Sequence, residues 1–479
     1  MDDRSMPAPV RVTGPAAWRW ALRFGLDPLM ATRRAHAAFG PFIVLAEALP
    51  FLRRPRAPLL NVPLVLTAGA AFNRELLSDP ETWRGVSLLP GGPRNSAARR
   101  LSQGLTRTTG HQHAHYRKVV APPLRRPSVN ALAEKMAPLA EAEVASWPAG
   151  SAIDVWEFPR RLMRSFAVEL LFGGNSEHGY FIADAVSRLM EDKWGGSAFA
   201  FRVNLPITSY GRIVRQSELL ERRVLEWAHT KRGQVDDRDL ASIIVNSPDA
   251  DGNPPSDATI VGQIPSLFAA AFEAGQSALT WTLLLLAQHP RVAAQLLDEL
   301  RHKMGGKMGS IWPSLSDAGD LSYLDAVVKE SMRVLPPVPF QIRVAQCDTK
   351  IFGFRLPKGA RVILNTFLTN RMPHPYPDGD VFRPERWFTI APTAFEFPVF
   401  SGGPHACPGY WFGSTAVKVA LAAILTRYRL VLAPNARIDY RVQPTMRPLQ
   451  RVHALLHPQD GAFTATPISG RIRDLVTLP

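Results

Sequence analysis

The chain has 479 residues, of which 46% are hydrophobic and 20% are charged, a balance typical of a globular protein with a large buried core. The net charge is +15, but the basic residues are scattered, without a Lys/Arg block interleaved with aromatic residues, so the sequence predicts no nucleic-acid interface. Two cysteines, Cys347 and Cys407, exclude a disulfide framework and favour a reducing, cytoplasmic location.

The N-terminal region carries no predicted membrane anchor. Residues 1–34 contain several arginines and no apolar run of signal-peptide length. The most apolar early stretch, Phe39 to Leu52, is short and contains Glu47, so it cannot cross a bilayer. We therefore expect no transmembrane segment.

The first hundred residues mix helical and strand-like patterns. The apolar spacing predicts helices over Ala17 to Phe39 and Ala70 to Asp79, and strands over Pro41 to Leu45 and Asn61 to Leu66. The stretch Gly85 to Gly104 is rich in Gly, Pro, Ser and Asn, which predicts a loop.

Three histidines lie in a predicted helix over Thr109 to Leu124. Their closeness suggests a metal site. A helix places only His111 and His115 on one face, whereas a strand would place His113 on that face as well. In a helix, His113 and Arg117 share a face, because they stand four residues apart.

Four amphipathic helices are predicted next, over Ala131 to Trp147, Arg160 to Phe172, His178 to Met190 and Gln216 to Lys231. No internal repeat and no flavin- or nicotinamide-binding pattern occurs in the sequence. Any electrons that the protein uses must therefore come from a separate protein.

A long, nearly all-apolar helical pattern covers Ile260 to Gln288, as expected for a helix that crosses the centre of a protein. Glu273 interrupts it, and a carboxylate in such a place is costly unless it has a role or a partner. A structural carboxylate paired with a buried arginine is the alternative to a functional acid. The next residue, Ala274, has no hydrogen-bonding side chain.

A further helix is predicted over Asp325 to Val334, where Glu330 and Arg333 share a face. Alone, such a pair is a commonplace surface ion pair. Beyond it, strand-like runs at Lys350 to Phe354 and Arg361 to Leu364 flank a Pro-Lys-Gly turn, which predicts a hairpin.

Cys407 stands in a loop of small residues, Phe400 to Gly409, that an apolar helical pattern follows at once. The loop glycines let the backbone approach a flat, bulky group. The free N–H groups at the start of the next helix are expected to favour a thiolate. Because no second cysteine is near, neither a zinc cage nor a disulfide explains the loop, and a haem iron with one axial cysteine does.

The loop resembles the haem-binding loop of the cytochrome P450 superfamily, in its soluble bacterial type, at Phe400, Gly403, Cys407 and Gly409, with His405 two residues before the cysteine. The resemblance covers nearly the whole chain. It implies a mainly α fold with small β-sheets, in which a long central helix lies over the haem and the cysteine loop beneath it. Residues 1–479 would form a single catalytic domain without a fused reductase, with a β-rich corner from about residues 40–70 and 340–370.

The resemblance also implies haem b as cofactor, with Cys407 as the iron ligand. Positions that match haem-contacting residues of the family are His113, Arg117, Ala270, Ala271, Arg343, Phe400, Gly403, His405 and Gly409; of these, His113, Arg117, Arg343 and His405 would bind the propionates. The match at Arg117 disfavours a zinc site and leaves His111 and His115 facing solvent. Beneath the haem, Glu330, Arg333 and Arg386 would form a buried charge network.

Glu273 and Ala274 are the catalytic candidates. In most members of the family the acid precedes a threonine whose hydroxyl orders the water that delivers protons, and Ala274 lacks it. We expect ordered water, a substrate hydroxyl or Ser277 to substitute, with Gln276 less favourably placed. Proton delivery would then run through Glu273 with help from the substrate.

The resemblance implies a largely apolar substrate pocket, lined by Leu88, Leu89, Phe268, Val338, Phe340 and Met446. An apolar small molecule of secondary metabolism, such as a terpenoid or polyketide, fits it. We expect a monooxygenase that takes electrons from a ferredoxin and its reductase or another separate donor; the positive net charge suits an acidic carrier or reflects composition alone. The alternatives are a peroxide-driven or non-hydroxylating haem-thiolate enzyme, and a haem-binding sensor without turnover.

Overall fold

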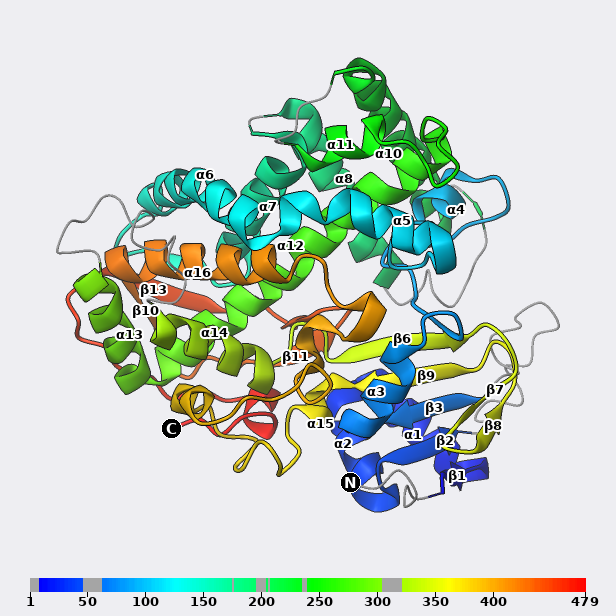
Figure 1. Ribbon diagram of the computed structural model, residues 1–479. Helices are drawn as coiled ribbons and strands as arrows, with labels where there is room; N and C mark the ends of the chain where they lie inside the picture. Colours follow the sequence, from blue (N-terminus) through cyan, green and yellow to red (C-terminus); the bar gives the residue numbers. More distant parts are fainter. Residues whose placement is uncertain are drawn as a thin grey trace.

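The computed structural model describes residues 8–45, 63–174, 176–194, 204–205, 207–234, 239–303 and 321–479. Within them, helices form the larger part and a six-stranded sheet with α1, α2 and α3 forms a corner at the lower right of Figure 1. The prediction of a mainly helical fold with small sheets is confirmed.

The helices are α1 Gly14–Leu26, α2 Pro28–Phe39, α3 Ala70–Ser78, α4 Ala97–Leu101, α5 Gly110–Val120, α6 Arg126–Ala145, α7 Glu157–Phe172, α8 Glu177–Trp194, α10 Ser209–Lys231, α11 Leu240–Asn246, α12 Asp257–Gln288, α13 Pro290–Lys303, α14 Ser322–Val334, α15 Thr366–Thr369 and α16 Tyr410–Arg427. The strands are β1 Val10–Val12, β2 Phe42–Leu45, β3 Leu64–Thr67, β4 Trp83–Arg84, β5 Ala152–Asp154, β6 Phe340–Ala345, β7 Thr349–Ile351, β8 Phe354–Leu356, β9 Arg361–Asn365, β10 Tyr428–Leu432, β11 Tyr440–Val442, β12 Met446–Pro448 and β13 His453–Pro458.

The largest sheet joins two distant parts of the sequence. Its order is β1-β2-β3-β9-β6-β4, with β9 parallel to β3 and antiparallel to β6. The start of the chain therefore packs against residues that follow α14. Residues 46–62, which fall in the β-rich corner predicted over 40–70, lie outside the described residues, as do the first two positions of the strand predicted over 61–66.

One local prediction between residues 85 and 365 is wrong, and another is incomplete. The hairpin is β7–β8, which turns at Phe352 and Gly353, while β9 joins the large sheet. The sequence pattern favoured the Pro-Lys-Gly turn because it could not show that β9 has distant partners. The predicted loop of residues 85–104 contains the short helix α4, which the Ser96 side chain caps by accepting a hydrogen bond from the Arg99 N–H at 3.2 Å.

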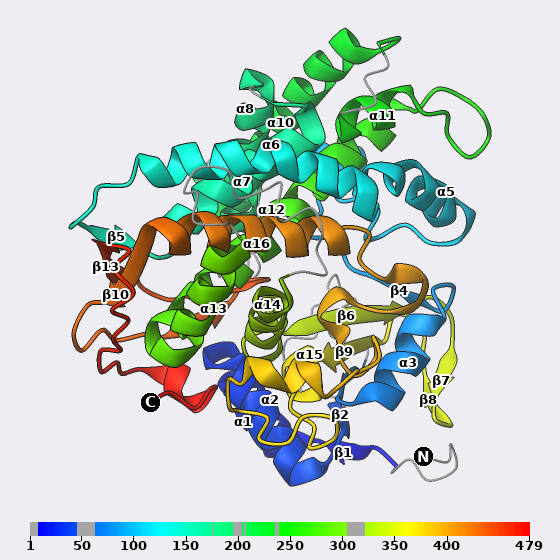
Figure 2. The same cartoon turned by 60° about the vertical axis from the view of Figure 1, so that its left-hand side comes forward.

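The 32-residue helix α12 organises the helical part of the molecule. It packs between α7 and α16, and it also contacts α4, α8, α10 and α14 (Figure 2). Its side chains enter the core from all sides, since Phe268, Trp281 and Leu285 have no exposed surface. The predicted central helix is therefore present, and Pro265 lies inside it.

The corner between α1 and α2 is tied to the C-terminal part of the chain. Asp27 caps α2 by accepting a hydrogen bond from the Met30 N–H at 3.2 Å. Both of its carboxylate oxygens also accept from the Tyr440 hydroxyl on β11, at 2.8 and 3.0 Å. The hairpin β11–β12 is thus anchored to the N-terminal helices.

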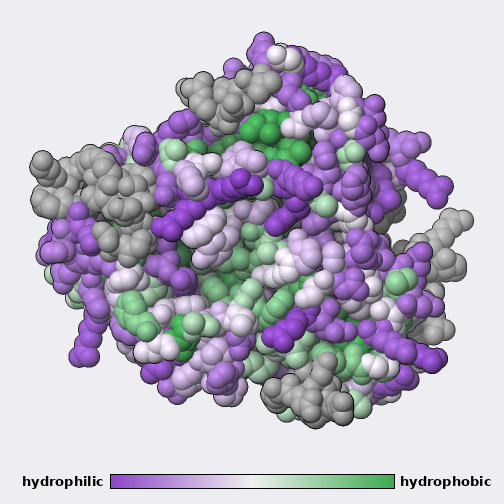
Figure 3. Space-filling view, viewed as in Figure 1, coloured by the Kyte–Doolittle hydropathy of each residue, from purple (hydrophilic) through white to green (hydrophobic). Residues whose placement is uncertain are grey.

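The face of the molecule shown in Figure 3 carries hydrophilic residues over much of its area, with hydrophobic residues gathered across its centre. Among the described helices, none combines the length and apolar character required to cross a bilayer.

Candidate active site

The loop before α16 is folded so closely that only glycine fits at one position. Gly403 has φ +62°, and a Cβ atom there would lie 2.3 Å from the carbonyl oxygen of Leu77 in α3. Cys407 N–H donates to the carbonyl of Phe400 at 2.8 Å and closes the loop. α16 then begins at Tyr410, whose ring packs edge-on against Phe400 at 4.8 Å.

Cys407 has exposed surface, although many protein atoms surround its sulfur. Burial raises the pKa of the Cys407 thiol, while the Gly409 N–H and the charge of Arg117 lower it by less. The Gly409 N–H therefore favours the thiolate, as the sequence predicts, but burial outweighs it. A bound metal cation would favour the ionised sulfur further.

Four basic side chains converge beside this loop. His113 and Arg117 come from α5, Arg343 from β6 and His405 from the loop itself. The rings of His113 and His405 lie with centroids 4.1 Å apart. Arg117 donates to the carbonyl of Ala406, and Arg343 donates to the Ser401 hydroxyl at 3.2 Å.

None of these four side chains has a carboxylate partner within the described parts of the chain. Burial and the charges of His113, Arg343 and Arg117 lower the pKa of His405 to about 3, and burial lowers that of Arg343 to about 10. The His405 Nε2 atom is buried without a hydrogen-bond partner. A ligand with carboxylates would relieve both features, and a haem with its two propionates fits them.

Across from the loop, α12 becomes accessible at one place only. Between Ile260 and Gln288, the residues that are not buried are Ala270, Ala271, Glu273 and Ala274. Three of them are alanines, whose small side chains leave the helix backbone less covered. The stretch predicted to face the haem is thus the one accessible stretch of α12.

Glu273 makes a contact that the sequence did not indicate. Its Oε2 accepts a hydrogen bond from the Thr445 hydroxyl at 3.2 Å. Burial raises the pKa of Glu273 and outweighs Arg447, Thr445 and Arg160, which lower it, while Glu191 adds to the rise. The group therefore holds its proton more readily than an exposed glutamate.

The polar neighbours of Glu273 on α12 are engaged elsewhere. Ser277 donates its hydroxyl proton to the Met446 carbonyl at 2.5 Å, and Trp281 donates to the same oxygen at 3.0 Å. Gln276 donates to the carbonyl of Trp156 at 3.1 Å. The expected substitution of the missing hydroxyl by Ser277 has no support in this geometry.

The residues predicted to line the substrate pocket fall into two groups. Leu89, Phe268 and Met446 are at most 1% exposed and belong to the main hydrophobic core. The others keep part of their surface, and these are Leu88, Val338 and Phe340.

The three histidines of α5 do not form a metal site. Among the described residues, no group of three or more His, Cys, Asp or Glu is placed to hold a metal ion. His111 is exposed as expected. His115 is partly exposed, and its Nε2 lies 2.8 Å from the carbonyl of Pro248.

Glu330 lies at the centre of a buried network. Its carboxylate accepts from both Nε and Nη2 of Arg333 at 2.8 Å and from Arg386 Nε at 2.9 Å. The N–H of Arg383 and the indole of Trp387 donate to the same carboxylate at 2.9 and 3.0 Å. The two arginines direct their remaining donors to backbone carbonyls, so the buried charges are compensated.

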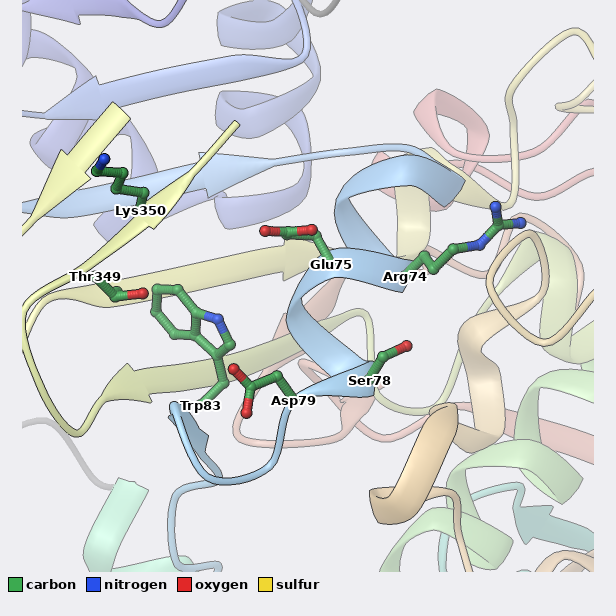
Figure 4. Close-up of a pocket in the computed structure, with 7 residues that line it drawn as sticks. All are labelled: Arg74, Glu75, Ser78, Asp79, Trp83, Thr349 and Lys350. Carbon is green, nitrogen blue, oxygen red and sulfur yellow. The ribbon is translucent and has the colours of Figure 1, made fainter. Parts of the chain in front are cut away.

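Two surface hollows lie elsewhere among the described residues. One, of about 310 Å³, adjoins the loop and includes Lys329, Trp387, Phe400 and Tyr410 in its lining. The other, of about 500 Å³, lies between α3 and β7 (Figure 4), where Glu75 extends toward Trp83 and Arg74 extends away. Its lining mixes acids and bases without a thiol, so Cys407 and the basic cluster mark the better site.

Comparison with known proteins agrees with this geometry. The cytochrome P450 family model matches residues 91–452. Cyclooctatin synthase of Streptomyces melanosporofaciens is 28% identical and pentalenene oxygenase of Streptomyces avermitilis is 27% identical; the matches cover 74% and 70% of this chain, and 79% and 75% of theirs. The putative cytochrome P450 139 of Mycobacterium tuberculosis is 27% identical over 81% of this chain and 91% of its own.

Among solved structures, retinoic acid-bound cyanobacterial CYP120A1 has a TM-score of 0.75 at 23% identity, with 95% of this chain and 100% of that chain covered. This likeness shows the fold. The chain therefore belongs to the cytochrome P450 family, whose members hold a haem through a cysteine thiolate and act as monooxygenases.

Proposed function

We propose that the protein inserts one atom of O₂ into an apolar small molecule of secondary metabolism. Electrons come from a separate ferredoxin and reductase or an equivalent donor. Support for the substrate class comes from relatives whose names carry the terpenoids pentalenene and cyclooctat-9-en-7-ol, and from the apolar residues around α12. The proposal includes a cytoplasmic location and one catalytic domain.

In this proposal each part of the site has a separate task. The bound haem supplies the activation of oxygen. Cys407 ligates the iron, and His113, Arg117, Arg343 and His405 hold the propionates. Glu273 holds a proton beside the accessible stretch of α12, while the packed side chains of the pocket exclude water from the substrate.

One observation carries the proposal: an accessible thiol next to four basic side chains that have no carboxylate partner in the described residues. The test is the absorption spectrum of the reduced, CO-bound protein. We expect the strongly red-shifted band of thiolate ligation in the natural protein and its loss in Cys407→Ser. A variant that kept the band would contradict the assignment of Cys407.

A second candidate is a peroxide-driven enzyme, or one that catalyses a cyclisation, coupling or rearrangement without hydroxylation. Ala274 favours it, together with the engagement of Ser277 and Gln276 away from Glu273. The two candidates are separated by comparing product formed from O₂ and an electron donor with product formed from peroxide alone. Compounds that induce type I spectral shifts provide the substrates for that comparison.

A further inference from the structure

The hydroxyl that lies next to Glu273 comes from another part of the chain. Thr445, in the turn between β11 and β12, is 172 positions away, yet its Oγ1 donates to Glu273 Oε2 at 3.2 Å. Thr445 is 2% exposed. On α12 itself, Ala274 has no hydroxyl to offer and Ser277 is already engaged.

The turn that carries Thr445 is held at several points. The Met446 carbonyl accepts from Ser277 and Trp281 on α12, at 2.5 and 3.0 Å. The Met446 N–H donates to the carbonyl of Pro337 at 2.8 Å. Met446 follows Thr445, and both its N–H and its carbonyl are hydrogen-bonded. The Thr445 hydroxyl is therefore preorganised toward Glu273 and loses little entropy in making the contact.

Charged groups from three elements face Glu273. Arg447 comes from β12, Arg160 from α7 and Glu191 from α8. Arg447 donates to the Gln443 side chain at 3.0 Å, and it forms no ion pair with Glu273. The Thr445 hydroxyl is thus the direct hydrogen-bond partner of the Glu273 carboxyl group, and the arginines act through space.

We propose that Thr445 is a positioning residue, whose hydroxyl completes with Glu273 an acid–hydroxyl pair between α12 and the β11–β12 turn for the delivery of protons. This role rests on the proposed monooxygenase function. Insertion of one oxygen atom into a C–H bond consumes one O₂, two electrons and two protons and yields the alcohol and one water. The separate donor supplies the electrons, and water reloads each proton that Glu273 gives up.

The first test measures the carboxyl group directly and requires no turnover. The infrared band of the protonated Glu273 carboxyl, identified by its absence in Glu273→Gln, is titrated against pH in the haem-loaded protein. We expect Thr445→Val to raise the pKa of Glu273, because the ionised carboxylate loses a donor, and Thr445→Ser to leave it unchanged. Thr280→Val, a buried threonine of α12 bonded to the Val155 carbonyl, is the matched control. An unchanged titration in Thr445→Val overturns the proposal.

The second test asks whether the hydroxyl can be moved. The holoenzyme receives electrons from a bacterial ferredoxin and its reductase. The measurement is the share of the consumed O₂ that appears as peroxide and the share that appears as water. We expect Thr445→Val to raise the share of peroxide several-fold. Adding Ala274→Thr to the same chain should return this share to the value of the natural protein. The role is overturned if Ala274→Thr does not lower the raised peroxide share. It is also overturned if Thr445→Ser or Thr280→Val raises that share as much as Thr445→Val does. Absence of the CO-bound thiolate band in the natural protein instead overturns the proposed function.

Discussion

Two glutamates of the proposed haem site, Glu330 and Glu273, differ in how many hydrogen bonds their carboxyl groups accept. Glu330 accepts five hydrogen bonds from two arginines, an indole and a backbone N–H, and it is fully buried. Glu273 accepts one, from Thr445, on the accessible stretch of α12. A carboxylate surrounded by donors is fixed in place, whereas one with a single neutral partner can exchange a proton. The first is suited to support and the second to chemistry.

The largest effect is expected when Glu330, the centre of the buried charge network, is removed. Glu330→Ala leaves Arg333 and Arg386 buried without their counter-charge, so we expect it to lower the free energy of unfolding by about 3–5 kcal/mol. Denaturant unfolding, followed by circular dichroism, measures this. The control is Glu226→Gln, which breaks an exposed pair with Arg223 and should cost less than about 1 kcal/mol. Equal losses in the two variants would contradict the contrast between buried support and surface charge.

A smaller effect is expected at the basic cluster, and its sign depends on the cofactor. Arg343→Gln should weaken haem binding by roughly tenfold, which corresponds to about 1.4 kcal/mol, because one charge-assisted contact to a propionate is lost. The same change should stabilise the protein from which haem has been extracted, because the buried charge of Arg343 then has no carboxylate partner. Haem transfer to apomyoglobin and thermal unfolding of both forms measure the two effects. Destabilisation of both forms would contradict the assignment.

The smallest expected effect is the pH dependence of stability at Glu273. Burial raises the folded-state pKa of Glu273 above its ordinary value of 4.5, so its contribution is fully present below that value and is lost as the pH rises through the folded-state pKa. Glu273→Gln removes this loss. We therefore expect the stability of the variant relative to the natural protein to increase across the titration, when unfolding is measured between roughly pH 4 and 8. A difference that is independent of pH would show that Glu273 does not titrate there.

Local patterns were enough to predict most helices and the cysteine loop. The period of apolar residues in α12, and the spacing around Cys407, are properties of neighbouring residues, and short-range geometry fixes what they form. The same holds for Glu330 and Arg333, which are one helical turn apart.

The distal contacts could not be predicted in this way, because they depend on pairing between remote segments. Thr445 meets Glu273 only after β11 and β12 pair and dock on α12. β9 was assigned to a local hairpin because its partner β3 lies almost 300 positions earlier. The rise in the pKa of Cys407 could not be predicted for a related reason, because burial comes from the whole fold and not from the loop.

The bond between Tyr440 and Asp27 has a consequence for protein engineering. The bond holds β11, the strand that leads to Thr445, against the corner between α1 and α2. Shortened versions of the chain that begin before α1 keep this hydrogen bond. Versions that begin after residue 27 leave the Tyr440 hydroxyl without this acceptor. Trimming the N-terminal helices should therefore raise the share of reduced oxygen released as peroxide, in addition to the stability lost with the packing of Val12, Ala17 and Trp20.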